Sequence, residues 1–125
     1  MKLRIKGDSL RVRLTRPEVQ QLDESGSVEE RVNFAGGAAL VYRLKRDAQV
    51  SAIEAIYEAG AVEIRVPEQI AKEWCGSDQV TLEGVQRTGA SAELRIVVEK
   101  DFACLAPRAG EDESDNFANP SNLRC

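Results

Sequence analysis

Apolar and polar residues alternate along most of this chain, which is the pattern of β-strands that bury one face and expose the other. The alternation predicts eight strands, at about 2–6, 9–14, 28–34, 39–45, 50–57, 61–66, 79–85 and 93–99. Gly7-Asp8 and Ala59-Gly60 supply tight turns. We therefore expect one hairpin from the first two strands and another from the fifth and sixth.

Capping residues mark two short helices between the predicted strands. Thr15 and Glu18 have the spacing of a capping box, and the helix that they begin is expected to stop at Gly26. The second helix is expected to start at Pro67, because the first helical position needs no N–H donor, and to stop at Gly76. One apolar stripe of each helix is expected to face the strands. It is formed by Val19 and Leu22 in the first helix and by Ile70 and Trp74 in the second.

Two halves of the sequence repeat the same pattern. Residues 9–22, SLRVRLTRPEVQQL, correspond to residues 61–74, AVEIRVPEQIAKEW, at an offset of 52. Residues 40–47, LVYRLKRD, correspond to residues 94–101, LRIVVEKD, at an offset of 54. The matches occur in the same order, and we interpret them as an internal duplication.

This pattern predicts an α+β fold that is mostly β. Each half contains strand, strand, helix, strand, strand, and neither half can bury a sheet face alone. We expect one duplicated domain over residues 1–100, a pseudo-twofold small β-barrel of the swapped-hairpin or double-psi class with two short helices. Its repeats cover about 1–47 and 48–101, and residues 101–125 are expected to form an irregular acidic C-terminal strap or tail.

Composition narrows the expected location and chemistry. A chain of 125 residues fits one domain, and its apolar runs are too short to span a membrane. The beginning, MKLRIKGDSL, lacks the apolar core of a signal peptide, and the three cysteines make a disulfide framework a poor fit. We therefore expect a cytoplasmic protein. The absence of histidine removes the commonest general base and the commonest zinc ligand.

The net charge of −4 is unevenly distributed. Residues 1–46 carry 10 basic and 6 acidic side chains, whereas residues 47–125 carry 7 basic and 15 acidic ones. Strand alternation places five cations of the first hairpin on one side as a basic ladder, formed by Lys2, Arg4, Lys6, Arg11 and Arg13. Two interpretations stay open. The ladder is a groove for a phosphate, a nucleotide or a nucleic acid backbone, or it is a solvated face balanced by acidic neighbours such as Glu29, Glu30 or Glu63.

The tail has no apolar period, and it is acidic before it becomes rich in Asn, Ser and Pro. Three interpretations are open for it: a disordered tail, an ordered strap, or a metal site. In the strap, the residues that face the basic ladder are Glu111, Asp112, Glu113 and Asp115. The candidate metal ligands are Cys104, Cys125, Asp112 and Asp115, which lack a CxxC spacing.

Residues 63–84, EIRVPEQIAKEWCGSDQVTLEG, resemble the strand–helix–strand half of the swapped-hairpin barrels of AbrB- and MazE-type regulators. Val66-Pro67 opens the helix, and Ser77-Asp78-Gln79-Val80 leads into the next strand. The resemblance implies a barrel half and nucleic-acid binding, but Ala71-Lys72 replaces the arginine that often follows the helix start in those regulators. The whole chain, above all residues 99–120, EKDFACLAPRAGEDESDNFANP, is more similar to an uncharacterised bacterial family known only as a domain of unknown function.

These observations predict a non-enzymatic binding or interaction module, because no spacing singles out a catalytic pair or a phosphate-binding loop. The expected partner is a small anionic ligand or another protein, with no cofactor and no membrane. The first alternative is an AbrB-like nucleic-acid-binding regulator. The second and less favoured alternative is a metal protein that uses the C-terminal cysteines.

Overall fold

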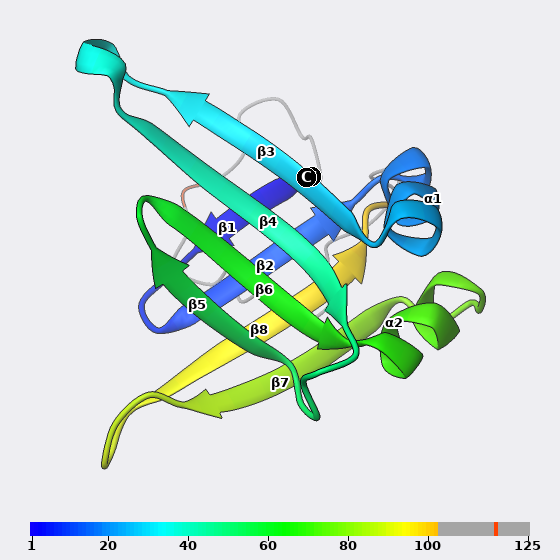
Figure 1. Ribbon diagram of the computed structural model, residues 1–125. Helices are drawn as coiled ribbons and strands as arrows, with labels where there is room; N and C mark the ends of the chain where they lie inside the picture. Colours follow the sequence, from blue (N-terminus) through cyan, green and yellow to red (C-terminus); the bar gives the residue numbers. More distant parts are fainter. Residues whose placement is uncertain (103–116, 118–125) are drawn as a thin grey trace.

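A computed structural model of the protein describes residues 1–102 and Phe117, which contain eight strands and two α-helices (Figure 1). In chain order the elements are β1 (Lys2–Ile5), β2 (Ser9–Leu14), α1 (Arg16–Ser25), β3 (Ser27–Asn33), a 3₁₀ turn η1 (Ala35–Gly37), β4 (Ala39–Asp47), β5 (Glu54–Glu58), β6 (Ala61–Pro67), α2 (Glu68–Cys75), β7 (Thr81–Arg87) and β8 (Glu93–Lys100). The fold is therefore α+β and mostly β, as the alternation predicted. The strap expected over residues 101–125 lies outside the described residues, apart from Asp101, Phe102 and Phe117.

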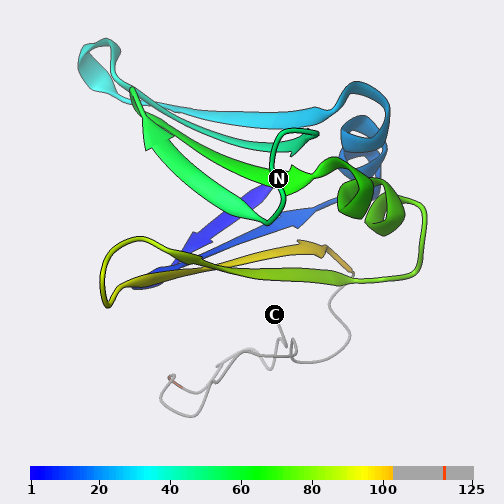
Figure 2. The ribbon, with the colours of Figure 1, turned by 60° about the horizontal axis from the view of Figure 1, so that its bottom comes forward.

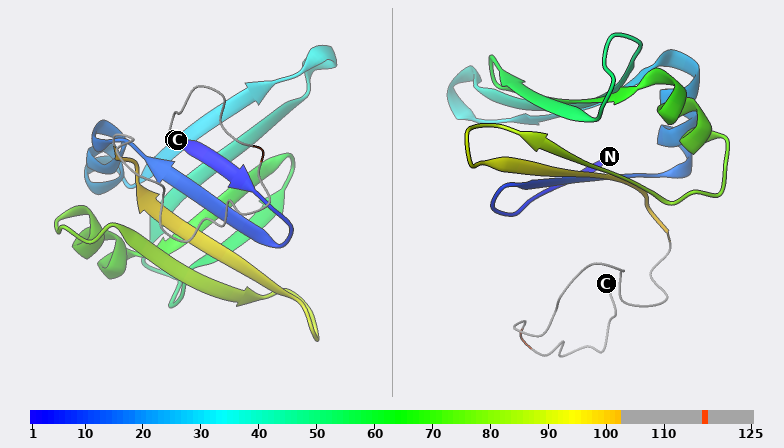
Figure 3. Two further views of the ribbon diagram at one scale, coloured as in Figure 1. Left: turned by 180° about the vertical axis from the view of Figure 1, so that it is seen from behind. Right: turned by 90° about the horizontal axis from the view of Figure 1, so that it is seen from below.

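The strands form two four-stranded sheets. Sheet A has the order β1-β2-β8-β7, and sheet B has the order β3-β4-β6-β5. Each sheet has a parallel central pair, β2 with β8 or β4 with β6, and an antiparallel strand on either side. The sheets face each other as two layers, and both helices lie at the same end of the molecule (Figures 2 and 3).

Each helix carries the chain from one sheet to the other. α1 connects β2 of sheet A to β3 of sheet B, and α2 connects β6 of sheet B to β7 of sheet A. If each strand of the first half is replaced by its equivalent in the second half (β1 by β5, β2 by β6, and so on) and the reverse, the order of sheet A becomes β5-β6-β4-β3. This is the order of sheet B, read from its other edge. The two halves of the chain therefore hold equivalent topological positions, while their origin by duplication stays a prediction.

The expectation of a closed barrel is wrong. Within the described part of the chain, β1 and β7 are the edges of sheet A, and β3 and β5 are the edges of sheet B. The edges formed by β5 and β7 meet through side chains, since Ala55 N–H donates to Gln86 Oε1 at 2.8 Å. Ile53 lies so close to Gly84 that a Cβ atom there would be 2.9 Å from the Ile53 Cβ. The layers therefore pack against each other at this edge without a hydrogen-bonded ladder that would close the sheets.

The helices begin and end close to the predicted residues. Glu18 Oε1 accepts hydrogen bonds from the Thr15 backbone N–H at 2.9 Å and from the Thr15 hydroxyl at 3.0 Å, which confirms the capping box. Gly26 ends α1 with a φ of 90°, a left-handed conformation that favours glycine, and its N–H donates to Leu22 O. Pro67 caps α2 rather than forming its first residue.

Two local predictions are corrected by the fold. β5 begins at Glu54, so residues 50–53 belong to a loop and not to a strand. The apolar stripe of α2 is formed by Ala71 and Trp74, which are buried, whereas Ile70 is 40% exposed. Residues three apart share a helix face as well as residues four apart, and in this short helix the packing selects the i, i+3 pair.

The core lies between the two sheets and consists mainly of branched aliphatic side chains. Its fully buried large residues are Leu14, Leu22, Leu44, Ile64, Ile96, Val12, Val66, Val98 and Trp74. Trp74 contributes the one aromatic ring of this set, and its indole Nε1–H donates to Val80 O at 3.1 Å. Among the described residues, no helix has the length and apolar composition needed to cross a membrane.

Candidate functional site

The five cations of the basic ladder belong to the first hairpin of sheet A, the sheet that lies in front in the left view of Figure 3. The pairing of β1 with β2 places Lys2 opposite Arg13 and Arg4 opposite Arg11, and Lys6 follows in the turn. The alternate residues of β2, such as Val12, are buried in the core. Like charges that face each other across two strands disfavour their pairing, so the hairpin needs negative charge nearby.

Glu99 supplies part of this negative charge. It lies on β8 at the register position of Arg13 and is only 8% exposed. Glu99 Oε1 accepts hydrogen bonds from Arg13 Nε at 2.5 Å and from Arg11 Nη1 at 3.2 Å. Lys2 Nζ lies 3.0 Å from Asp101 Oδ2. Glu99 and Asp101 thus each pair with cations of the ladder.

The acids that balance the ladder are not those proposed from sequence. Glu29 and Glu30 lie on β3 and Glu63 lies on β6, so all three belong to sheet B. Glu99 was not singled out because its strand reaches the first hairpin only through the parallel pairing of β2 with β8. A parallel pair requires a long connection, and no local sequence signal identifies the partner.

A second buried carboxylate lies on the outer face of sheet B. Glu63 is 9% exposed, and two guanidinium groups hold it in place: Arg43 Nη1 at 2.8 Å and Arg65 Nε at 2.6 Å. Arg43 also pairs with Glu29, with 2.6 Å between Nη2 and Oε1. Each sheet thus has one buried glutamate that is held by two arginines.

The pKa of the Glu63 carboxyl lies below its ordinary value of 4.5. Burial alone would raise this pKa, but the hydrogen bonds from Arg43 and then Arg65 stabilise the charged form and lower it. A carboxyl with a lowered pKa in the folded state contributes stability above its ordinary pKa and loses it as the pH falls.

We therefore expect wild-type protein to lose its stability advantage over a Glu63→Gln variant below about pH 4.5. The advantage should be fully present above this pH and decrease as the pH falls through the lowered pKa. Urea unfolding at a series of pH values measures the free energy of unfolding of both proteins. If the difference in the free energy of unfolding between the two proteins stays constant from pH 6 to pH 3, the pKa of Glu63 is not lowered by folding.

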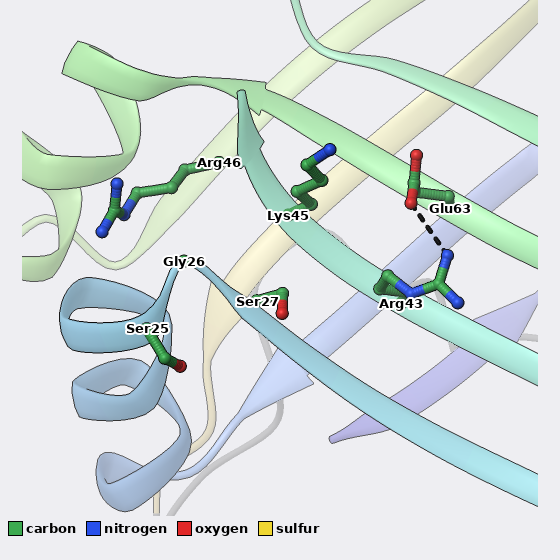
Figure 4. Close-up of a pocket in the computed structure, with 7 residues that line it drawn as sticks. All are labelled: Ser25, Gly26, Ser27, Arg43, Lys45, Arg46 and Glu63. Atoms are coloured by element: carbon green, nitrogen blue, oxygen red, sulfur yellow. Dashed lines mark hydrogen bonds and ion pairs between the residues drawn. The ribbon is translucent and has the colours of Figure 1, made fainter. Parts of the chain in front are cut away.

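A hollow of about 470 Å³ lies where α1 ends beside the outer face of sheet B (Figure 4). Three cations line it, and the complete lining is Ser25, Gly26, Ser27, Arg43, Lys45, Arg46 and Glu63. The candidate residues named from sequence do not include Lys45 or Arg46. The sequence signal for these two cations is the basic end of residues 40–47, LVYRLKRD, a segment that also forms part of the repeat.

Arg46 joins the two helices. Its Nε and Nη2 atoms donate at 3.2 Å to the carbonyl oxygens of Leu22 and Asp23 in the last turns of α1. Its Nη1 lies 2.7 Å from Glu68 Oε1 in the first turn of α2. These contacts place positive charge at the carbonyl end of α1, where Leu22 O also accepts from the Gly26 N–H, so the side chain has a clear structural role.

A larger crevice of about 840 Å³ lies between α1, α2 and the ends of β2 and β8. Leu14 and Val19 supply apolar parts of its wall, and the Cys75 thiol lies 3.7 Å from Val19 O. Burial, together with the nearby charge of Asp23, raises the pKa of the Cys75 thiol. The thiol is therefore protonated at neutral pH, as expected for a cysteine that packs as a half-buried small hydrophobic residue.

The four candidate metal ligands, Cys104, Asp112, Asp115 and Cys125, lie outside the described residues. Within residues 1–102 and Phe117, no group of three Cys, Asp or Glu side chains is arranged to hold a metal ion.

Comparison with known proteins assigns the chain to a family and not to an activity. No curated protein and no solved structure matches it. One family model, described as a Family of unknown function (DUF7009), matches residues 1–121 and so spans both sheets and most of the tail. The predicted membership of a family of unknown function is confirmed: the chain belongs to the family DUF7009.

Proposed function

We propose that this protein is a non-enzymatic interaction module and that its basic ladder binds a partner of negative charge. The observation that carries the proposal is the stacking of two like-charged pairs, Lys2 with Arg13 and Arg4 with Arg11, on one sheet face. A bound anion would add to the charge compensation that Glu99 and Asp101 already provide for these cations.

The spacing of the ladder favours an extended acidic peptide as the partner. Alternate residues of a strand are roughly 6.6–6.8 Å apart, so Lys2 and Arg4 of β1 are separated by about this distance, and Lys6 follows in the turn. An extended peptide with an acidic residue at every second position has the same repeat. Backbone pairing along the exposed edge of β1 would add affinity to the charge contacts.

The acidic C-terminal segment of this chain is a natural competitor for the same face. Glu111, Glu113 and Asp115 occupy alternate positions in the sequence, and Asp101, which precedes this segment by ten residues, lies beside Lys2. Because the segment is tethered there, its effective concentration at the ladder is high. The proposed strap would therefore occupy the ladder until a more strongly charged partner displaces it.

An Arg4→Gln/Lys6→Gln variant is expected to bind a labelled glutamate-rich peptide about tenfold more weakly than wild type, within the range of two exposed ion pairs. Fluorescence anisotropy at low salt measures the affinity. The matched control is Arg31→Gln/Lys72→Gln, which removes the same charge from exposed positions on β3 and α2. If both variants lose the same affinity for the peptide, binding depends on the overall charge of the protein and not on the ladder, which would overturn the proposal.

The same assay tests the strap. A full-length variant with four neutralised tail residues, Glu111→Gln, Asp112→Asn, Glu113→Gln and Asp115→Asn, is expected to bind the peptide more tightly than wild type. Unchanged affinity would exclude the tail as a competitor.

A nucleic-acid-binding regulator is the second candidate, because the same cations suit a phosphate backbone. A short duplex in place of the peptide separates the two functions. Binding that is stronger for the duplex and that falls steeply between low and physiological salt would favour the regulator. Metal binding through Cys104 and Cys125 is the third candidate. Equally low metal content in the full-length protein and in its Cys→Ser variants would exclude it.

A further inference from the structure

The hollow beside α1 differs in place and in shape from the basic ladder. It lies on the outer face of sheet B, whereas the ladder lies on sheet A. Three of its lining residues are cations and one is an acid, Glu63. Arg43 pairs with Glu63 and Glu29, and Arg46 pairs with Glu68. Among the described residues, Lys45 is therefore the lining cation whose nearest carboxylate partner is the most distant.

Lys45 is the cation with the loosest attachment in this hollow. Its Nζ lies 3.9 Å from Asp47 Oδ2, at the limit of an ion pair, and its side chain is 44% exposed. In the parallel pairing of β4 with β6, Lys45 stands directly opposite Arg65, which has the same charge. Asp47 Oδ2 lies 3.9 Å from both Lys45 Nζ and Arg65 Nε, and an anion beside Lys45 would add a closer negative partner for the ammonium group.

The neighbouring groups are held in place by the fold. The contacts of Arg43 with Glu29 and Glu63 use three of its five N–H groups, and the other two keep a defined direction. Ser27 is the register partner of Lys45 on β3, and its hydroxyl belongs to the lining (Figure 4). Donors that are ordered before a ligand arrives lose little entropy on binding.

We propose that this hollow binds a small molecule through a phosphate or carboxylate group. The ammonium of Lys45, the hydroxyl of Ser27 and the guanidinium of Arg43 are the donors for that group. The volume of the hollow, about 470 Å³, lies in the range of small-molecule sites and leaves space for the rest of such a ligand. The site is independent of the peptide-binding ladder.

The test is a titration of the full-length protein with inorganic phosphate and, separately, with citrate, followed through the backbone amide signals in ¹H–¹⁵N NMR spectra. Saturable shifts are expected at Gly26, Ser27 and Lys45 for at least one of the two anions. Lys45→Gln is expected to weaken the binding about tenfold, the effect of losing one charge-assisted hydrogen bond. Ser27→Ala should weaken it less.

Two control variants make the result specific. Lys72→Gln removes one exposed cation from α2 and should leave the affinity unchanged, and Arg4→Gln tests the ladder separately. No saturable shift with either anion, or equal affinity for wild type and Lys45→Gln, would overturn the proposed site. A loss in Arg4→Gln but not in Lys45→Gln would assign anion binding to the ladder alone, which keeps the two proposals distinguishable.

Discussion

A Trp74→Ala variant is expected to lose about 3–5 kcal/mol of the free energy of unfolding, the range for removing a large aromatic side chain from a core. Trp74 is fully buried, its Nε1–H donates to Val80 O, and Lys100 Nζ lies 5.2 Å from the ring centroid. The substitution therefore opens a cavity at the end of the core and also leaves a carbonyl without its donor. Urea unfolding followed by circular dichroism measures the loss.

Ile70→Ala is the matched control for this prediction. Sequence periodicity placed Ile70 beside Trp74 on the buried face of α2, but Ile70 is 40% exposed. Its truncation should cost well under half as much as that of Trp74, because the side chain is smaller and 40% of Ile70 stays in contact with water. Similar losses for the two variants would mean that α2 packs through the predicted pair of Ile70 and Trp74 and not through Ala71 and Trp74.

Glu99→Gln is expected to lower the free energy of unfolding by about 3 kcal/mol, as expected when one partner of a buried ion pair is removed. Arg11 and Arg13 are 14% and 15% exposed, so both guanidinium groups would remain poorly solvated beside a neutral amide. The variant should also bind the acidic peptide more tightly, because the ladder gains positive charge. Urea unfolding and fluorescence anisotropy measure the two effects.

A variant that only lost structure would bind the peptide more weakly. Lower stability together with tighter peptide binding therefore identifies an effect of charge. Glu83→Gln is the control, since it removes the same charge from sheet A, where Glu83 pairs with Arg95 at 3.2 Å on an exposed surface. This variant should change stability by less than about 1 kcal/mol. If Glu99→Gln and Glu83→Gln have equal effects on stability, the pairing of Glu99 with the two arginines contributes no more than a surface contact.

The sequence by itself determined the local elements of this protein. The capping box of Thr15 and Glu18 and the left-handed turn at Gly26 involve atoms only a few residues apart, so they are encoded where they occur. The alternation of residues 2–6 and 9–14 likewise placed the five cations on one side of the first hairpin. The repeat offsets of 52 and 54 also separate the first residues of equivalent strands. β5 begins at Glu54, 52 residues after Lys2 of β1, and β8 begins at Glu93, 54 residues after Ala39 of β4.

Only the tertiary structure decided which distant strands meet. The pairing of β2 with β8 brings Glu99 to Arg11 and Arg13, and the pairing of β4 with β6 sets Lys45 opposite Arg65. At the β5 and β7 edges the layers meet through side chains such as Ile53 against Gly84, and the strands form two open sheets where a closed barrel was expected. Periodicity identifies the buried face of each strand, but the choice of neighbour depends on how whole sheets pack. The charge balance of both candidate sites follows from that choice, and it is therefore a property of the folded chain.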